Sequence, residues 1–297
     1  GSTGKPKGIL TTHRNVSRIA YHTDYISISE NDALLQLSNY AFDGSSFDLY
    51  GALLNGAKLT LVGEEEVADV MRLTELIKDS GITVFFVTTA LFNTLVDHGL
   101  ESLRGLRHIL FGGERASVPH IRKALRPLGP GVLLHVFGPT ETTVFATCYP
   151  ITETWDGQGT ATVPIGAPIA RSETLVLNEQ GRLQPDRVPG ELWIAGDGVA
   201  SGYVNLPEQT ASKFRPHPFR EGETVYGTGD LVRRLPDGNL EFLDRIDSQV
   251  KLRGYRIELG EIESRLLDCA GVKEVFVALI ENDGAPYLCA YIVAEQT

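Results

Sequence analysis

Short apolar runs and helical stretches alternate between residues 33 and 136, and this alternation constrains the fold more than any other feature of the sequence. The runs "LLQLS", "KLTLVG", "TVFFVT", "RHILFGG" and "VLLHVFG" predict strands. Between two of them, residues 69–80 place their apolar side chains on one face of a helix, and Gly81 follows as a stop signal. This order predicts an α/β fold, a mostly parallel sheet with flanking helices, whose ligands bind at the carboxyl ends of the strands.

The pattern changes after residue 166. Short β runs separated by turn signals such as "NEQG" and "LPDG" predict a small β subdomain over residues 167–246. From residue 247 onward a hairpin, an amphipathic helix and two more strands predict the start of an α+β module. We therefore expect three parts, residues 1–166, 167–246 and 247–297.

Composition limits the classes of partner. The 297 residues include 42% hydrophobic and 22% charged residues, which is ordinary for a globular protein. A formal net charge of -11 argues against nonspecific nucleic-acid binding and against an anionic membrane surface. The cysteines Cys148, Cys269 and Cys289 are odd in number and widely spaced, and no apolar run reaches the length of a membrane span. We expect a cytoplasmic protein that binds small molecules or other proteins.

The first eight residues, "GSTGKPKG", have the composition of a phosphate-binding loop. Glycines allow close approach of the backbone, and hydroxyl, amide and ammonium groups donate to phosphate oxygens. The pattern is not the loop of the common NTPases, because Gly4 and Lys5 are followed by Pro6 rather than by Ser or Thr. On these residues alone, a flexible linker is an equal alternative.

Three further stretches carry carboxylates at predicted turns, each with a functional and a structural interpretation. Glu141 in "FGPTETT" could hold Mg²⁺ or lie in a capped turn, and Asp230 in "YGTGDL" could bind ribose hydroxyls or form a surface turn. Asp43 in "SNYAFDGSSFDLY" would need a cationic partner if buried, or else it or Ser45 would cap a helix. The charged run "DRIDSQVKLRGYRIELGEIE" is typical of a solvated face.

The order of these motifs is more specific than any one of them. "STGKPKG", "FDGSSFD", "FGPTETT", "GELWIAGDGVASGYVN", "YGTGDL" and "DRIDSQVKLRGYRIELGEIE" resemble, in sequence order, the core motifs of the adenylate-forming superfamily. The closest resemblance is to the amino-acid adenylation domains of nonribosomal peptide synthetases, and it spans essentially the whole chain. It implies ATP- and Mg²⁺-dependent formation of an aminoacyl-adenylate, followed by transfer to the phosphopantetheine thiol of a peptidyl carrier protein beside neighbouring synthetase domains.

The resemblance also implies roles for individual residues. The β- and γ-phosphates of ATP would be held by the loop, Mg²⁺ by Glu141 and the α-phosphate by Thr140, while Phe137, at the family's usual tyrosine, would stack on adenine beside Gly138. Asp230 and Arg245 would bind the ribose, Asp247 would be the hinge of the C-terminal module, and Gly254 would line the pantetheine tunnel. The loop residues are Ser2, Thr3, Gly4, Lys5 and Lys7, and the implied catalytic residues are Thr3, Lys7, Thr140, Glu141 and Arg245.

Asp43 matches the aspartate that pairs with the α-ammonium of the substrate in amino-acid activators. The matching pocket residues are Gly44, Phe47, Phe86, Leu110, Gly112, Val136, Val144 and Phe145. None carries a hydrogen-bonding side chain, so the pocket favours an aliphatic amino acid. The set is most similar to isoleucine-activating domains, but leucine and valine stay open because one methylene is worth only about 1–3 kcal/mol.

Two alternatives remain at this stage. An acyl- or aryl-CoA ligase of the same superfamily has no ammonium to neutralise, which argues against it, and a noncatalytic fragment could bind nucleotide or amino acid without turnover. Asp244, Ser201 and Gly227 depart from the family pattern without removing a proposed ligand. The strand before the loop and the last motif, with its lysine, are absent, so we expect an N- and C-terminally truncated domain with weak or no activity alone.

Overall fold

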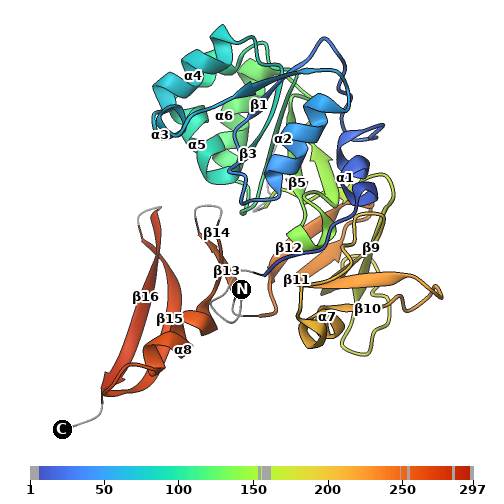
Figure 1. Cartoon of the computed structure of the whole chain (residues 1–297), viewed down its shortest axis with the longest axis vertical. Coiled ribbons are helices and arrows are strands. Elements are labelled where there is room, and N and C mark those ends of the chain that lie inside the picture. The colour runs from blue at the N-terminus through green and yellow to red at the C-terminus, as the bar shows by residue number, and fades with distance from the viewer. Residues whose placement is uncertain are drawn as a thin grey trace.

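The N-terminal part of the chain forms a seven-stranded sheet in the order β2-β1-β3-β4-β5-β6-β7 (Figure 1). The computed structural model describes residues 7–152, 155, 162–247, 249–252, 255–282 and 285–294. The strands from β1 to β5 are parallel, as predicted, and β6 and β7 extend the sheet in the antiparallel sense. The strands are β1 (Ala33–Gln36), β2 (Lys58–Leu61), β3 (Val84–Thr88), β4 (His108–Gly112), β5 (Leu133–Phe137), β6 (Thr147–Pro150) and β7 (Ala167–Pro168).

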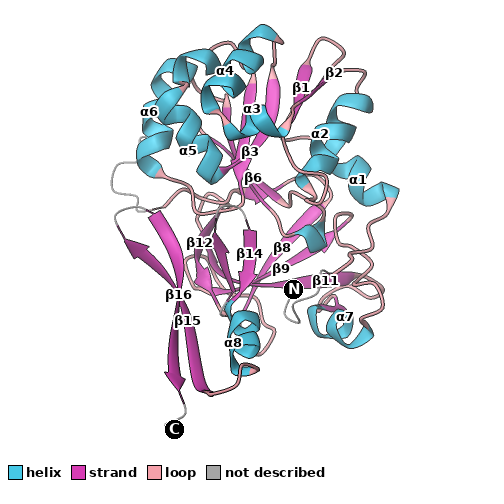
Figure 2. Ribbon diagram, turned by 60° about the vertical axis from the view of Figure 1, so that its left-hand side comes forward, coloured by secondary structure: helices cyan, strands magenta, loops and turns pink. Residues whose placement is uncertain are grey.

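Helices cover both faces of this sheet, because successive side chains of a strand point to opposite sides. Leu34 packs in one core with residues of α1 and α2, whereas Leu35 packs in another with residues of α4, α5 and α6. Figures 1 and 2 show the same two helical layers. The helices are α1 (His13–Ala20), α2 (Gly44–Leu53), α3 (Glu64–Ala68), α4 (Val70–Asp79), α5 (Thr89–His98) and α6 (Val118–Leu128), with short 3₁₀ turns at Leu100–Leu103 and Thr140–Thr142.

Helix α4 confirms the amphipathic prediction in detail. The Asp69 carboxylate accepts hydrogen bonds from the backbone N–H groups of Met71 and Arg72, which caps the start of the helix. Leu73 and Ile77 are fully buried against the sheet, each contributing about 1.5–3 kcal/mol. Gly81 ends the helix in the left-handed region, with φ +62°.

The second part is an antiparallel sheet in the order β10-β11-β9-β8, with β12 also pairing β11. Both predicted turn signals are tight turns, because the Gly181 N–H donates to Asn178 O and the Gly238 N–H to Leu235 O, each at 2.9 Å. The elements are β8 (Ser172–Leu177), β9 (Gly190–Gly196), α7 (Pro207–Lys213), β10 (Phe214–Pro216), β11 (Thr224–Arg234) and β12 (Leu240–Arg245).

The C-terminal part has the predicted hairpin, helix and strand pair. Helix α8 packs along β15, where Leu259 and Val277 are buried, and this module extends away from the helices of the first sheet (Figures 1 and 2). The elements are β13 (Gln249–Leu252), β14 (Tyr255–Glu258), α8 (Leu259–Leu267), β15 (Val272–Asn282) and β16 (Ala285–Ala294). Among the described residues, every helix is too short or too polar to cross a membrane.

Candidate functional site

A cavity of about 450 Å³ opens at the carboxyl ends of β1, β3, β4 and β5, the edge at which ligands of parallel sheets bind. Its wall is completed by Asp230 and Arg245 from the second sheet and by Gln249 and Lys251 from β13. Residues from all three parts of the chain therefore enclose one space.

The cavity brings together most of the predicted substrate pocket and most of the described residues predicted to bind the nucleotide. The loop at Phe137 and Gly138 turns back closely on the chain, since a Cβ on Gly138 would lie 2.5 Å from Val144 O. From the predicted pocket, the lining residues are Asp43, Gly44, Phe86, Val136, Val144 and Phe145. From the predicted nucleotide site, they are Phe137, Gly138, Thr140, Asp230 and Arg245.

Three predicted pocket residues do not line the cavity and support its wall instead. Phe47 is fully buried and packs edge-to-face on Phe145, with ring centroids 5.3 Å apart. Leu110 is fully buried in the same core. A Cβ on Gly112 would lie 2.2 Å from Val136 O, so this glycine allows β4 and β5 to approach; the next residue, Gly113, lines the cavity.

The Asp43 carboxyl lies in an environment that disfavours its charge. Its Oδ2 atom is buried and has no hydrogen-bond partner among the described residues. Burial raises the pKa of Asp43 above its ordinary value, although the Thr140 hydroxyl and the Val144 N–H act in the opposite direction. The helix-cap alternative is wrong, because the Asp43 side chain makes no cap hydrogen bond to α2 and the Ser45 hydroxyl donates to Phe42 O.

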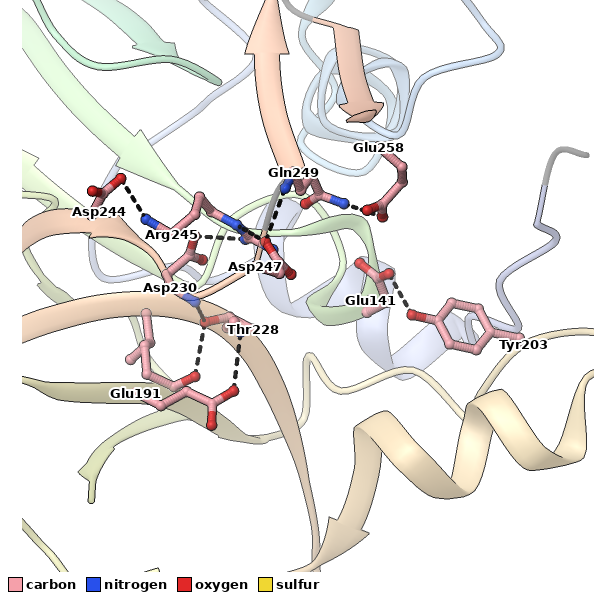
Figure 3. Close-up of polar contacts among 12 residues, drawn as sticks. Glu141, Glu191, Tyr203, Thr228, Asp230, Asp244, Arg245, Asp247, Gln249 and Glu258 are labelled. Carbon is pink, nitrogen blue, oxygen red and sulfur yellow. Dashed lines mark hydrogen bonds and ion pairs between the residues drawn. The ribbon is translucent and has the colours of Figure 1, made fainter. Parts of the chain in front are cut away.

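Arg245 joins two carboxylates at the other side of the cavity (Figure 3). Its Nη1 atom lies 2.7 Å from Asp230 Oδ1, and its Nε and Nη2 atoms lie 2.8 Å and 2.6 Å from the two oxygens of Asp247. The Asp230 N–H donates to the Thr228 hydroxyl, which in turn donates to Leu192 O, so the irregular part of β11 that carries Asp230 is fixed to β9. The surface-turn alternative is wrong, because Asp230 is buried inside this strand. Asp230 and Arg245 are therefore held rigidly, facing the cavity.

Charge pairing dominates this cluster. Burial alone lowers the pKa of Arg245, but Asp247 and Asp230 outweigh it and raise that pKa above its ordinary value. Burial likewise raises the pKa of Asp247, but Arg245 outweighs it and holds that pKa low. The bidentate pair keeps both groups ionised at neutral pH.

Glu141 and Lys7 meet at Tyr203. The Tyr203 hydroxyl donates to Glu141 Oε1 at 2.6 Å, and the Lys7 ammonium lies 5.6 Å from the centroid of the Tyr203 ring. Burial, together with the negative charge of Glu141, raises the pKa of the Tyr203 hydroxyl, which therefore stays a proton donor. Glu141 is buried and is not among the residues that line the cavity.

The donor chemistry of Glu141 fits Mg²⁺, which prefers carboxylate oxygen and usually keeps phosphate and water as its other ligands. Among the described residues, no group of three or more His, Cys, Asp or Glu side chains forms a metal cluster. Glu141 would hold the ion through carboxylate oxygen, and its Oε1 atom also accepts the hydrogen bond from Tyr203. The loop residues Ser2, Thr3, Gly4 and Lys5, like Gly254, lie outside the described residues.

A second cavity of about 360 Å³ shares Phe137, Asp230 and Lys251 with the first. The Lys251 ammonium lies 5.6 Å from the centroid of the Phe137 ring. His135 also lines this cavity, and its Nδ1 atom lies 2.7 Å from Pro164 O, which can only accept, so Nδ1 carries the proton. Burial lowers the pKa of His135 to about 4, which leaves the ring neutral.

Tyr203, His135 and Lys251 were not predicted as site residues. Tyr203 lies within the quoted "GELWIAGDGVASGYVN" motif, and His135 directly precedes "VFGPTETT". Position in or next to a motif was therefore the sequence signal that could have identified these two residues. Lys251 lies in a run interpreted as a solvated face, and only the fold brings it to Phe137.

Comparison with known proteins gives one consistent result. A family model described as AMP-binding enzyme matches residues 1–204. Over 297 residues the chain is 54% identical to bacitracin synthase 3 of Bacillus licheniformis, covering 100% of the chain and 5% of that protein. Over 296 residues it is 51% identical to surfactin synthase subunit 1 of Bacillus subtilis (strain 168), covering 99% of the chain and 8% of that protein. The chain thus spans a small fraction of these curated relatives.

Among solved structures, the chain is similar to holo-PA1221, an NRPS protein containing adenylation and PCP domains bound to a vinylsulfonamide inhibitor. The TM-score is 0.90 at 34% identity, covering 99% of this chain and 51% of that one. NpsA-ThdA, an artificially fused adenylation–PCP di-domain from Klebsiella oxytoca, gives a TM-score of 0.88 at 30% identity, covering 99% of this chain and 58% of that one. The chain belongs to the AMP-binding enzyme family, among the adenylation domains of nonribosomal peptide synthetases.

Proposed function

We propose that this chain activates an aliphatic α-amino acid with ATP, giving an aminoacyl-adenylate and pyrophosphate. The observation that carries the proposal is a single cavity with Asp43 among apolar walls and the paired Asp230 and Arg245 across from it. One end suits an ammonium group beside a hydrocarbon chain, and the other suits a polyhydroxylated nucleotide.

The amino-acid end has a carboxylate oxygen that is buried and unpaired within the described part of the chain. Such an atom costs free energy, and the α-ammonium of a substrate would supply the missing partner. Of the residues that line this end, the matched pocket positions, including Gly44, Phe86 and Val136, have no hydrogen-bonding side chain, and Ser38 and Thr88 line the cavity as well. Burial at roughly 25 cal/mol per Å² of apolar area favours an aliphatic side chain. We propose isoleucine first, with leucine and valine as the nearest competitors.

At the nucleotide end, Asp230 would accept hydrogen bonds from the ribose hydroxyls, Arg245 would assist there, and Phe137 would stack on the base. A carboxylate oxygen of the amino acid then attacks the α-phosphorus, and the bond from that phosphorus to the bridging oxygen breaks, releasing pyrophosphate. Negative charge rises on the phosphates, so donors such as the Thr140 hydroxyl, the Lys7 ammonium and the remaining loop residues stabilise the transition state. Mg²⁺ held by Glu141 would supply further charge neutralisation.

We further propose that the acyl group passes to the phosphopantetheine thiol of a peptidyl carrier protein, with Asp247 as the pivot of the C-terminal module and Gly254 near the arm. The support is the likeness to a protein described as containing adenylation and PCP domains. In this step the thiol sulfur attacks the acyl carbon, and AMP leaves.

The test is ATP–pyrophosphate exchange by the full-length protein, with all the amino acids and a set of fatty and aryl acids. We expect the highest kcat/KM with isoleucine, followed by leucine or valine. Exchange driven best by a fatty or aryl acid would indicate an acyl- or aryl-CoA ligase instead. Exchange driven best by a polar amino acid would overturn the pocket interpretation, and nucleotide binding without any exchange would indicate a noncatalytic module.

A further inference from the structure

Arg18 of α1 is a buried guanidinium that binds backbone carbonyls. It is 2% exposed and, within the described residues, makes no ion pair with a carboxylate. Its Nη2 atom donates to Thr142 O (3.0 Å), Thr143 O (3.2 Å) and Phe145 O (2.6 Å), and its Nη1 atom donates to Ser172 Oγ (2.6 Å). Burial lowers the pKa of Arg18 to about 10, so it stays charged at neutral pH.

The segment that Arg18 binds is strained. Thr143 and Val144 are consecutive β-branched residues in the left-handed region, with φ +59° and +64°. That region is unfavourable for residues with a branched Cβ and persists only where the surroundings fix it. Three converging carbonyl contacts with one guanidinium provide such fixing, because the charge compensates for the crowding of carbonyl dipoles.

The opposite side of this segment forms the amino-acid end of the cavity. The side chains of Val144 and Phe145 line the cavity, and the Val144 N–H lies near enough to the Asp43 carboxyl to lower its pKa. The Phe145 ring packs edge-to-face on Phe47 and Phe86, with centroids 5.3 Å and 5.1 Å away. A change in the backbone of this segment would therefore displace both the Val144 N–H near the Asp43 carboxyl and the side chains of Val144 and Phe145 that line the cavity.

Gly198 provides an independent way to change the same contact. A Cβ on Gly198 would lie 2.4 Å from Arg18 Nη2 and 2.7 Å from Thr142 O. The Thr143 hydroxyl also donates to Gly198 O at 2.9 Å. Any side chain at this position must push the guanidinium away from the carbonyls that it binds.

We propose that Arg18 is a positioning residue for amino-acid selection: by holding the carbonyls of Thr142, Thr143 and Phe145, it sets the geometry of Asp43 and the cavity wall. This inference rests on the proposed function. It predicts that loss of the contact affects recognition of the amino acid more than binding of ATP. Asp230 and Arg245 are fixed from the second sheet, although Thr140 and Glu141 lie on the turn next to the segment that Arg18 binds.

The kinetic test measures ATP–pyrophosphate exchange for Arg18→Gln, Arg18→Lys and Gly198→Ala. Arg14→Ala is the matched control, because Arg14 lies on the same helix with its side chain 74% exposed. We expect the amino-acid KM to rise at least tenfold in Arg18→Gln and Gly198→Ala and less in Arg18→Lys, with a clearly smaller rise in the ATP KM. We also expect the ratio of kcat/KM for isoleucine to kcat/KM for valine to decrease.

A purely structural arginine would lower the active fraction, and hence kcat, without changing either KM, and that result would overturn the proposal. Equal rises in both KM values would overturn it as well. Hydrogen exchange separates this question from the proposed function, because it needs no substrate. We expect faster exchange of the Thr143 and Phe145 amides, which are bonded to Thr140 O and Thr143 O, in the Arg18 variants and not in Arg14→Ala. Unchanged protection would exclude the holding role even if the wild type activates a different substrate.

Discussion

At the scale of single residues, the two ends of the first cavity treat their carboxylates in opposite ways. Asp230 is paired with Arg245 and fixed through Thr228, whereas Asp43 has an unpaired, buried oxygen among the described residues. A carboxylate whose charge is already neutralised can accept hydrogen bonds from neutral hydroxyls, whereas an unpaired buried carboxylate favours binding of a cation. The contrast supports our proposal that the nucleotide binds at the Asp230 end and the amino acid at the Asp43 end.

The first prediction concerns Asp43→Asn. The amide keeps the size of the side chain but removes its charge, so a charge-assisted hydrogen bond worth about 1.5–3 kcal/mol is lost. We expect the KM for the amino acid to rise about tenfold to a hundredfold, with the ATP KM changed less than about twofold. Exchange kinetics measure both constants, and Asp79→Asn, an exposed charge loss in α4, is the control. An unchanged amino-acid KM would show that Asp43 does not contact the ammonium.

The second prediction concerns Gly229→Ala. Gly229 has φ +75°, and a Cβ there would lie 2.8 Å from Asp247 Oδ2 and 3.0 Å from Arg245 Nη2. Gly238 has φ +86° with nothing within 4 Å of such a Cβ, so Gly238→Ala carries the same backbone cost without the contact. We expect this left-handed conformation to lower the free energy of unfolding of each alanine variant by about 1–2 kcal/mol. Urea denaturation measures this change.

Both alanine variants should lose that stability, but only Gly229→Ala should raise the ATP KM, by about threefold to tenfold, because it displaces the Arg245 guanidinium. Equal ATP KM values in the two variants would contradict a role for the Arg245 pair in nucleotide binding.

The sequence could indicate the site's chemistry but not all of its geometry. The apolar walls and Asp43 follow from residue type and motif order, and most of them line the cavity. Phe47, Leu110 and Gly112 do not, because residue type cannot separate a lining position from the layer behind it. Arg18 was missed for a related reason: its acceptors are backbone carbonyls more than a hundred positions away, and a carbonyl has no sequence signature.

At the scale of elements, the parallel sheet was predictable because β3, β4 and β5 are mostly buried apolar runs and α4 between the strands has one apolar face, whereas the edge strand β2 is half-exposed. Strands β6 and β7 were not predicted. They are short, and their pairing with β5 depends on long-range contact rather than on local pattern. The same limit applies to α1, whose buried polar residues Asn15 and Arg18 give it no simple apolar face.

Helix α2 supports the third prediction, through Asp48. Its Oδ2 atom accepts from the Ser38 N–H at 3.0 Å, its Oδ1 atom has no partner among the described residues, and Ser38 lines the first cavity. Burial raises the pKa of Asp48 to about 7. The folded state then binds more protons than the unfolded state between about pH 4 and pH 7, so this group reduces the free energy of unfolding as the pH rises through that range.

In Asp48→Asn that pH dependence disappears, while the amide oxygen still accepts from Ser38. We expect the difference in unfolding free energy, variant minus wild type, to become more positive from pH 5 to pH 8, by an amount on the order of 1–3 kcal/mol. Urea denaturation at several pH values measures it, with Asp79→Asn as the control. A difference that is independent of pH would contradict the burial of a titrating carboxyl.

At the scale of the whole molecule, all three parts contribute to the wall that the two cavities share, which includes Phe137, Asp230, Arg245, Gln249 and Lys251. The local patterns indicate each part, and we propose the same division at about residues 166 and 246. How the parts meet was not predictable, because contacts such as that of Lys251 with Phe137 depend on how the parts are placed relative to one another. Asp247 lies at the point where β12 leads into β13, and its bonds to Arg245 and to the Gln249 N–H join the second sheet to the C-terminal hairpin.

The last prediction follows from the position of Lys251, a cation from the C-terminal module that lines both cavities. A nucleotide brings several negative charges into a protein whose net charge is -11, so removal of a nearby cation should weaken its binding. We expect Lys251→Met to raise the Kd of a nonhydrolysable ATP analogue about threefold to tenfold, since an ammonium near an aromatic ring and an anion contributes about 0.5–2 kcal/mol. Lys273→Met, on the exposed side of β15, removes the same charge away from the cavities and should leave Kd unchanged. Titration calorimetry measures both variants. Tighter binding in Lys251→Met would reverse the assignment, because it would mean that the ammonium competes with the base for the face of Phe137.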